Sequence, residues 1–219
     1  NGEGVHRARL STSGQLFFDR WQTPTTPNNI DVVRLSAAPS PTASRQSSVV
    51  AHHCPLLSAP DPWAEYEQPG FLSGTIKAAD GVTDLYWRMV VPRKPYGQLP
   101  LDSNGSAAPL PWAGGGGGYP AIVYVYGGPH AHNVDASWHW LSRSWETYMA
   151  QKGYIVFVLD NRGSEHRGRD FEQATFRQLG QVEMQDQMRG VEFLKSLPYV
   201  DGNRLGVHGW SYGGYMTIS

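Results

Sequence analysis

Ser211 is the residue whose surroundings best fit a chemical role. It lies in the segment 209–213, which reads Gly-Trp-Ser-Tyr-Gly and matches the pattern G-x-S-x-G. In a nucleophile elbow, this pattern holds a serine on a sharp, strained turn between a buried strand and a helix, where only small neighbours fit. A buried strand is expected before Ser211, and a helix can begin at Tyr212. The sequence therefore predicts that Ser211 is a nucleophile; the alternative is a glycine-rich turn with an incidental serine.

A serine hydroxyl needs a base to remove its proton, and on this kind of fold an Asp or Glu and then a His follow the serine in the chain. Only eight residues follow Ser211, and none of them is Asp, Glu or His. We therefore expect a chain that stops before the rest of its catalytic machinery and is inactive alone. His208 is not expected to be the base, because alternation along a strand sends near neighbours to different faces.

A second candidate segment is Tyr-Val-Tyr-Gly-Gly-Pro-His at 124–130. It follows an apolar run, and in α/β-hydrolases the loop after the corresponding strand contributes to the oxyanion hole. The phenolic hydroxyl of Tyr126 and the backbone N–H of Tyr212 are suitable donors to the negative charge that acyl transfer builds on a carbonyl oxygen. From the residues alone, Tyr126 is equally well explained as an ordinary aromatic residue of a strand.

The elements that must position these residues belong to the second of two stretches with different textures. Residues 1–69 are rich in Ser, Thr and Pro, carry short β-like runs at 14–19 and 30–35, and include a polar linker at 36–48. From residue 70 onward, strands and helices alternate at βαβ spacing, which indicates an α/β domain with a largely parallel sheet. Strands are expected at 71–77, 85–91, 121–126, 154–159 and 204–208, and helices at 138–149 and 181–197.

The overall composition excludes several classes of protein. The 219 residues carry a net charge of −1 and 40 % hydrophobic residues, which suits a globular chain with no basic surface for nucleic acid. The single cysteine, Cys54, cannot form an internal disulfide, and His52 and His53 beside it lack the further ligands that a closed zinc site needs. We expect no metal, no cofactor and no nucleic-acid partner. The Gly- and Pro-rich stretch 98–118 predicts a long loop.

Taken together, four segments resemble the prolyl oligopeptidase family of serine peptidases, in particular its dipeptidyl-peptidase IV branch and the bacterial dipeptidyl and prolyl tripeptidyl aminopeptidases. They are the elbow at 209–215, Tyr-Gly-Gly-Pro at 126–129, Asp-Asn-Arg-Gly-Ser at 160–164, and the segment 179–187. The resemblance implies that residues 70–219 are the N-terminal half of an α/β-hydrolase domain and that residues 1–69 end a β-propeller. It also implies Ser211 as nucleophile, Tyr126 and Tyr212 as oxyanion donors, and Asp160 with Arg162 as a structural pair.

The same resemblance implies an exopeptidase that releases short N-terminal peptides after proline through an acyl-enzyme on Ser211. Its partner would be a peptide with proline near the N-terminus. A homodimer and a periplasmic, cell-surface or secreted location are compatible with the resemblance. Two alternatives stay open: an esterase or acyl-peptidase on the same fold, and a catalytically silent relative that acts as a binding module.

Overall fold

The computed structural model describes residues 4–37, 49–92 and 118–219. The described chain divides into two compact units: residues 1–66 with 135–141, and residues 67–134 with 142–219. Residues 38–48 and 98–117 of the two loops expected from the sequence lie outside the described residues. No helix within the described ranges is long and apolar enough to cross a membrane.

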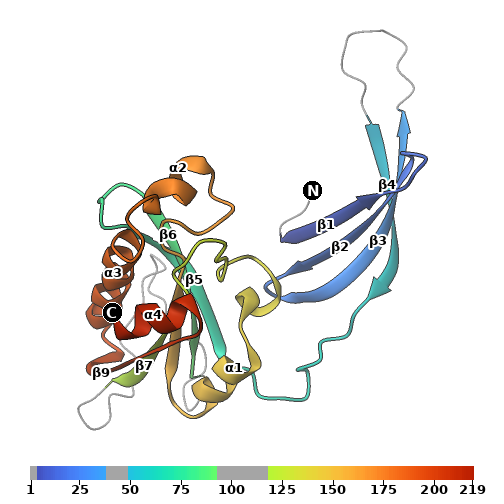
Figure 1. The fold of residues 1–219 in the computed structure, drawn as a ribbon. Helices are drawn as coiled ribbons and strands as arrows, with labels where there is room; N and C mark the ends of the chain where they lie inside the picture. Colours follow the sequence, from blue (N-terminus) through green and yellow to red (C-terminus); the bar gives the residue numbers. More distant parts are fainter. Residues whose placement is uncertain (1–3, 38–48, 93–117) are drawn as a thin grey trace. The chain divides into compact units, whose positions relative to one another are not determined.

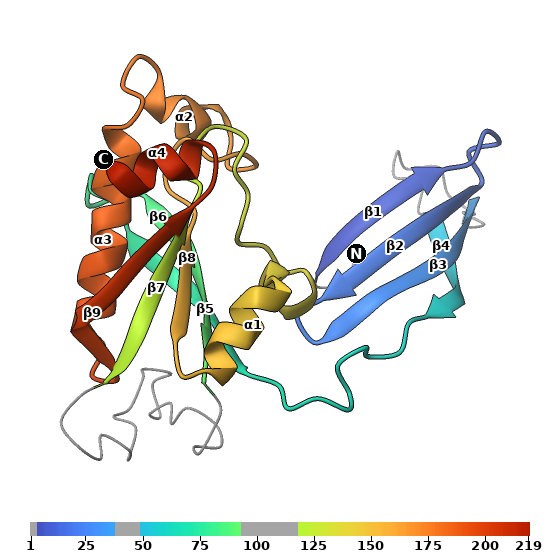
Figure 2. The same ribbon diagram turned by 60° about the horizontal axis from the view of Figure 1, so that its bottom comes forward.

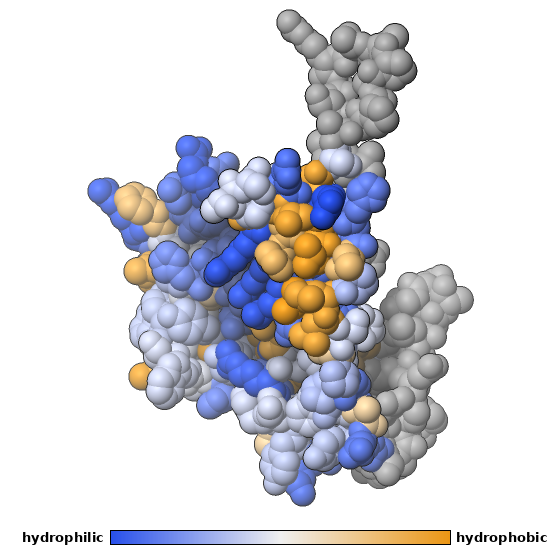
Figure 3. Space-filling view, turned by 90° about the vertical axis from the view of Figure 1, so that its right-hand side faces the viewer, coloured by the Kyte–Doolittle hydropathy of each residue, from blue (hydrophilic) through white to orange (hydrophobic). Residues whose placement is uncertain are grey.

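The first unit contains a four-stranded antiparallel sheet in the order β1-β2-β3-β4. Its strands are β1 (Val5–Leu10), β2 (Leu16–Thr23), β3 (Thr26–Ala37) and β4 (Val49–Ser58). The runs expected at 14–19 and 30–35 lie largely in β2 and β3, whereas β4 was not predicted. Apolar side chains also gather on the surface of this sheet (Figure 3), where Phe18, Leu56 and Leu57 are exposed.

The second unit is built on a five-stranded sheet with the order β5-β6-β8-β7-β9. Figure 1 shows these strands, which are β5 (Gly70–Lys77), β6 (Asp84–Val91), β7 (Tyr119–Val125), β8 (Ile155–Leu159) and β9 (Val200–Gly209). β8, β7 and β9 are parallel, whereas the hairpin β5–β6 joins β8 in antiparallel fashion. The sheet is therefore mixed rather than largely parallel, because two of its five strands form that hairpin.

Helices cover both faces of this sheet (Figure 2). α1 (Ser144–Gln151) packs with Val156, Val158 and Tyr124 on one face, and α3 (Val182–Ser196) packs against Phe157 and Leu159 on the other. Because successive strand residues point to opposite faces, the fully buried strand β8 supplies both cores. A short α2 (Arg169–Glu172), a 3-10 turn (Gln173–Thr175) and α4 (Tyr212–Ile218) complete the unit.

The helix expected at 138–149 is wrong in its first half. Trp138–Leu141 forms a single 3-10 turn in which His139, Trp140 and Leu141 have left-handed backbone angles, and α1 begins only at Ser144. The N–H groups of Trp138 and His139 instead bond to the Gln22 side chain and the Pro24 carbonyl, within the first unit. The end of the helix was predicted correctly: Gly153, with φ of 89°, donates its N–H to the carbonyl of Ala150.

Strand β9 is more exposed than its sequence predicted. The segment 204–208 has the apolar texture of a strand buried on both faces, yet most of its residues are exposed, including Val207 at 46 %. The reason is its position, because β9 pairs only with β7 and forms an edge of the sheet among the described residues. The strand that precedes Ser211 is therefore open to solvent along one side.

Candidate active site

Ser211 occupies the turn between β9 and α4. Its backbone angles, φ 57° and ψ −120°, lie outside the regions that residues other than glycine normally adopt. Such a conformation costs on the order of 1–3 kcal/mol and persists only where the surrounding structure enforces it. The strand, the strained serine and the helix together have the backbone geometry that a nucleophile elbow requires.

The two glycines of the pentapeptide are explained by close backbone contacts. A Cβ on Gly209 would overlap the carbonyl group of Gly213, and a Cβ on Gly213 would overlap the carbonyl oxygen of Val125 at the end of β7. Gly214 differs, since its nearest neighbour to an added Cβ would be the Gly209 carbonyl oxygen at 3.9 Å. The pattern has glycine at 209 and 213 because no larger residue fits there. The tight fit arises because α4 begins directly against the end of β7.

Tyr212 is the first residue of α4, where backbone N–H groups have no partner within the helix. Its phenolic hydroxyl donates a hydrogen bond of 2.8 Å to Oε1 of Glu183, a fully buried carboxylate on α3. Burial and this bond raise the pKa of Tyr212 well above its ordinary value, so the phenol stays protonated. The Glu183 contact fixes the side chain of Tyr212 and leaves its backbone N–H as the group that can serve a substrate.

Tyr126 directly follows β7, the strand that pairs with β9 and so ends beside Ser211. The rings of Tyr126 and Tyr212 lie 6.3 Å apart, with Gly128 against both: an added Cβ there would stand 2.8 Å from Tyr212 and 3.2 Å from Tyr126. The structure thus brings all three predicted site residues to the same edge of the sheet. Their catalytic roles remain predictions.

His208 lies beside the rings of Tyr124 and Trp145, with centroid distances of 5.9 and 5.1 Å. These rings belong to the face of the sheet that α1 covers. The residue is exposed rather than buried, and its ring packs on these two aromatic side chains, as expected.

Asp160 and Arg162 do not form the pair that the sequence resemblance implied. Asp160 accepts hydrogen bonds from the backbone N–H groups of Asn133 and Val134, and its burial raises its pKa. Arg162 instead binds Asp186 on α3 through two bonds of 2.8 and 2.9 Å, and Asp80 at 3.0 Å. Each residue anchors a different segment to the site: Asp160 holds the loop after β7, and Arg162 holds the loop after β8.

Sequence reasoning missed two buried amides next to the Tyr126 turn. Gln187 on α3 donates to the side-chain oxygen of Asn161, and Asn161 donates to the backbone carbonyl of Gly127. Asn161 is 1 % exposed and Gln187 6 %. Asn161 lies in the segment 160–164 and Gln187 ends the segment 179–187, two of the segments on which the family resemblance rests, but the resemblance gave neither residue a role. Their hydrogen bond joins positions 26 residues apart, and nothing in a single sequence indicates that the two side chains meet.

Two further histidines follow the Tyr126 turn in the chain. His130 is largely exposed, and His132 packs edge to face on His166. Within the described residues, no group of three or more His, Cys, Asp or Glu could hold a metal ion.

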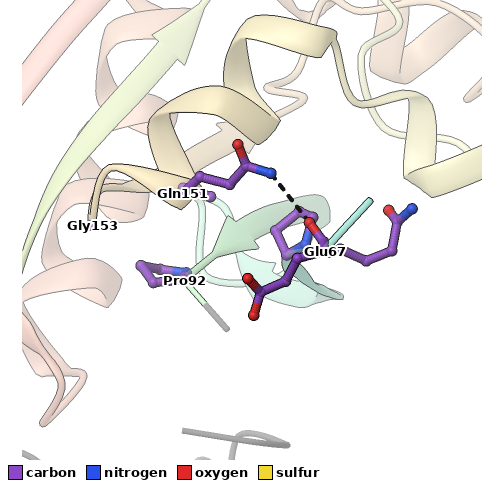
Figure 4. Close-up of a pocket in the computed structure, with 7 residues that line it drawn as sticks. Glu67, Pro92, Gln151 and Gly153 are labelled. Carbon is purple, nitrogen blue, oxygen red and sulfur yellow. Dashed lines mark hydrogen bonds between the residues drawn. The ribbon is translucent and has the colours of Figure 1, made fainter. Parts of the chain in front are cut away.

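A small pocket near Gly153 is lined partly by Glu67, Pro92 and Gln151. The side-chain amide of Gln151 donates a hydrogen bond to the Glu67 carbonyl (Figure 4). It adjoins the amino end of β8, whereas Ser211 follows the carboxyl end of the parallel β9.

A serine on a strained strand-to-helix turn, beside the end of a neighbouring parallel strand, is the arrangement that hydrolases of the α/β type use. Comparison with known proteins narrows this class. The model of the prolyl oligopeptidase family matches residues 140–219. Mouse (Mus musculus) dipeptidyl peptidase 8 is 30 % identical over 214 residues, which are 97 % of this chain and 21 % of that protein.

Two crystal structures are also similar. A candidate dipeptidyl aminopeptidase IV from Bacteroides ovatus has 45 % identity and a TM-score of 0.79 over 99 % of this chain and 26 % of that one. Porphyromonas gingivalis dipeptidyl peptidase 4 has 27 % identity and a TM-score of 0.70 over 98 % of this chain and 26 % of that one. The family match and these relatives bear out the resemblance of this chain to the prolyl oligopeptidase family of serine peptidases, in its dipeptidyl peptidase branch. It spans about a quarter or less of the length of these relatives.

Proposed function

We propose that this chain carries the nucleophile and the oxyanion donors of a serine exopeptidase that releases short N-terminal peptides after proline. The observation that carries the proposal is the strained turn at Ser211, with φ 57° and ψ −120°, next to Tyr126 and Tyr212. A turn of this kind costs stability and is kept where a function depends on it. The choice of an aminopeptidase over other acyl-transfer enzymes rests on the similarity to dipeptidyl peptidases.

In the proposed reaction, Oγ of Ser211 attacks the carbonyl carbon of the scissile peptide bond. Its proton passes through a base to the leaving amine, the C–N bond breaks, and an ester forms on Ser211; water then hydrolyses this ester and restores the hydroxyl. The Tyr126 hydroxyl and the Tyr212 N–H stabilise the oxyanion in both steps. His208 faces Tyr124 and Trp145, so we assign the base to another histidine.

The proposal extends to the architecture and partners of the whole protein. Residues 70–219 would be the N-terminal half of an α/β-hydrolase domain, and residues 1–69 the end of a β-propeller. The substrate would be a peptide with proline near its N-terminus, and the enzyme, with no cofactor or metal, would act as a homodimer. Residues 1–219 alone would not turn over, because an elbow without a histidine base leaves the serine hydroxyl unactivated.

The test uses the natural gene product, its Ser211→Ala variant and residues 1–219 alone. Each is assayed on a Gly-Pro-arylamide and on a simple aryl ester, with fluorophosphonate labelling as a measure of an activated serine. We expect the gene product to hydrolyse the arylamide and Ser211→Ala to lose at least about 10⁴-fold in kcat. Hydrolysis of the ester alone would contradict the peptidase assignment, and turnover by residues 1–219 would contradict the need for a further base.

A further inference from the structure

The turn that carries Tyr126 is anchored by two buried side-chain amides, Gln187 and Asn161, which are hydrogen-bonded to each other and form a relay. Gln187 Nε2 donates to the carbonyl of Leu159 at 3.0 Å and to Oδ1 of Asn161 at 2.9 Å. Asn161 Nδ2 in turn donates to the carbonyls of Gly127 at 2.9 Å and Arg162 at 2.7 Å. The relay connects α3, the end of β8 and the first residue after Tyr126.

The hydrogen-bond partners fix the orientation of both amides. Backbone carbonyls only accept hydrogen bonds, so Nδ2 of Asn161 must face Gly127, and its oxygen must face Gln187. The amide of Gln187 has to present its nitrogen for the same reason. Neither side chain can flip without setting two acceptors against each other, and in a buried setting that costs more than the loss of an exposed bond.

The turn has little freedom apart from this anchor. Gly127 has a φ of +79° and packs closely against Met216 of α4, since an added Cβ would lie 3.0 Å from the Met216 side chain. The next residue, Gly128, contacts the rings of Tyr126 and Tyr212. The Gly127 carbonyl therefore sets the position of Tyr126 from one side, while α4 bounds the turn from the other.

We propose that Asn161, supported by Gln187, is a positioning residue for the Tyr126 hydroxyl. This inference rests on the proposed function and assigns one further residue to its oxyanion site. Oxyanion donors act because they are in place before charge develops, and a shift of about 1 Å can cost about 10²-fold in rate. Without the Asn161 bond, the Gly127 carbonyl is released and the Tyr126 hydroxyl moves with it. The rate would fall while ground-state binding stays nearly unchanged.

A double-mutant cycle on the natural gene product separates this role from general support of the fold. Tyr126→Phe removes the hydroxyl and should lower kcat about 10²- to 10³-fold. Asn161→Ala alone should lower kcat at least about tenfold, with KM changed less than about threefold, as expected for an interaction made in the transition state. In the Tyr126→Phe background, Asn161→Ala should change kcat less than about twofold, because the hydroxyl that it positions is gone.

Gln185→Ala is the matched control, an exposed amide on α3 two residues from Gln187, and it should leave kcat unchanged. Asn161→Ser and Gln187→Leu serve as second variants if Asn161→Ala does not fold, and both should show the same dependence on the Tyr126 hydroxyl. Equal loss of kcat in both backgrounds would overturn the inference and leave the proposed function intact. An unchanged kcat in Tyr126→Phe would overturn the inference together with the oxyanion role proposed for Tyr126, and would leave Ser211 as the proposed nucleophile. Failure of the wild type to cleave the arylamide or the ester would overturn both.

Discussion

Two turns at the carboxyl edge of the sheet hold the predicted site residues, and they are held in different ways. The Ser211 turn is fixed by steric fit, because Gly209 and Gly213 bring α4 against the ends of β9 and β7 without room for a Cβ. The Tyr126 turn also has close contacts, at Gly127 and Gly128, but it is anchored in addition by a polar contact from the buried amide of Asn161 to the carbonyl of Gly127.

The difference separates two ways of keeping a reactive group in place. A close steric contact can be recognised in the sequence, because only glycine fits it. At the elbow, the same tight turn also imposes backbone strain on the serine. An amide network cannot be recognised in this way, because many side chains can reach a carbonyl, and it introduces no backbone strain of its own. Steric fit should therefore be sensitive to any added atom, and the network should be sensitive to loss of one donor.

The largest effect should come from filling the contact between α4 and β7. Gly213→Ala puts a methyl group onto the Val125 carbonyl, and we expect the free energy of unfolding to fall by about 3 kcal/mol or more. Gly214→Ala is the matched control: it has room for the methyl group and should be neutral or stabilising by up to about 1 kcal/mol. Urea unfolding of both variants makes the comparison. Equal effects would mean that steric fit does not hold this turn.

An intermediate effect should come from relieving the strain at Ser211. Ser211→Gly removes the side chain that disfavours a φ of 57°, whereas Ser211→Ala removes the hydroxyl and keeps the strain. We expect Ser211→Gly to be more stable than Ser211→Ala by about 1 kcal/mol, the relief of strain being partly offset by the greater freedom of glycine in the unfolded chain. Thermal unfolding of the two variants measures the difference. A Ser211→Gly variant that is no more stable than Ser211→Ala would show that this turn stores no strain.

The smallest effect should come from Asp80, which lies at the exposed end of the polar contacts that Arg162 makes with Asp80 and Asp186. Asp80 accepts hydrogen bonds from the hydroxyl and N–H of Thr83, lies 3.0 Å from Arg162, and has a pKa lowered to about 2, chiefly by the Thr83 hydroxyl. Because the folded-state pKa lies below the ordinary 3.8, ionised Asp80 stabilises the fold above pH ~4, and this contribution is lost as the pH falls toward 2.

Asp80→Asn should therefore reduce the free energy of unfolding by less than about 1 kcal/mol at pH 6, since the carboxylate is exposed and screened by solvent. The difference from wild type should shrink between pH 4 and pH 2. Guanidinium unfolding at several pH values tests this, with Asp170→Asn as an exposed control carboxylate. A difference that grows with falling pH would contradict the assigned role of Asp80.

The sequence predicted much of the fold because hydrophobic periodicity is local. The strands that became β5, β6, β7 and β8, and the helix α3, lie within a few residues of where the pattern indicated. It also marked the strand–turn–helix at Ser211, because glycine spacing reports the steric contact there. The recognition of the prolyl oligopeptidase family was confirmed by the family match and the similar structures.

What failed depended on partners distant in the chain. Trp138 and Trp145 have helical spacing, but the N–H of Trp138 bonds to Gln22 in the first unit, and the helix starts later. Arg162 pairs with Asp186 rather than Asp160 because α3 brings that carboxylate to it. The hydrogen bonds of Asn161 and Gln187 could not be predicted for the same reason. No periodicity encodes which carbonyl a buried amide will reach.

The order of the strands also constrains how the polypeptide assembles as it is made. Among the strands that the structure describes, β6 and β7 are consecutive in sequence, yet β8 lies between them in the sheet. A nascent chain therefore exposes the edges of both strands until β8 has left the ribosome, and β7 waits longer for β9. Ser211 directly follows β9, so it is set into its turn only after β9 has paired with β7.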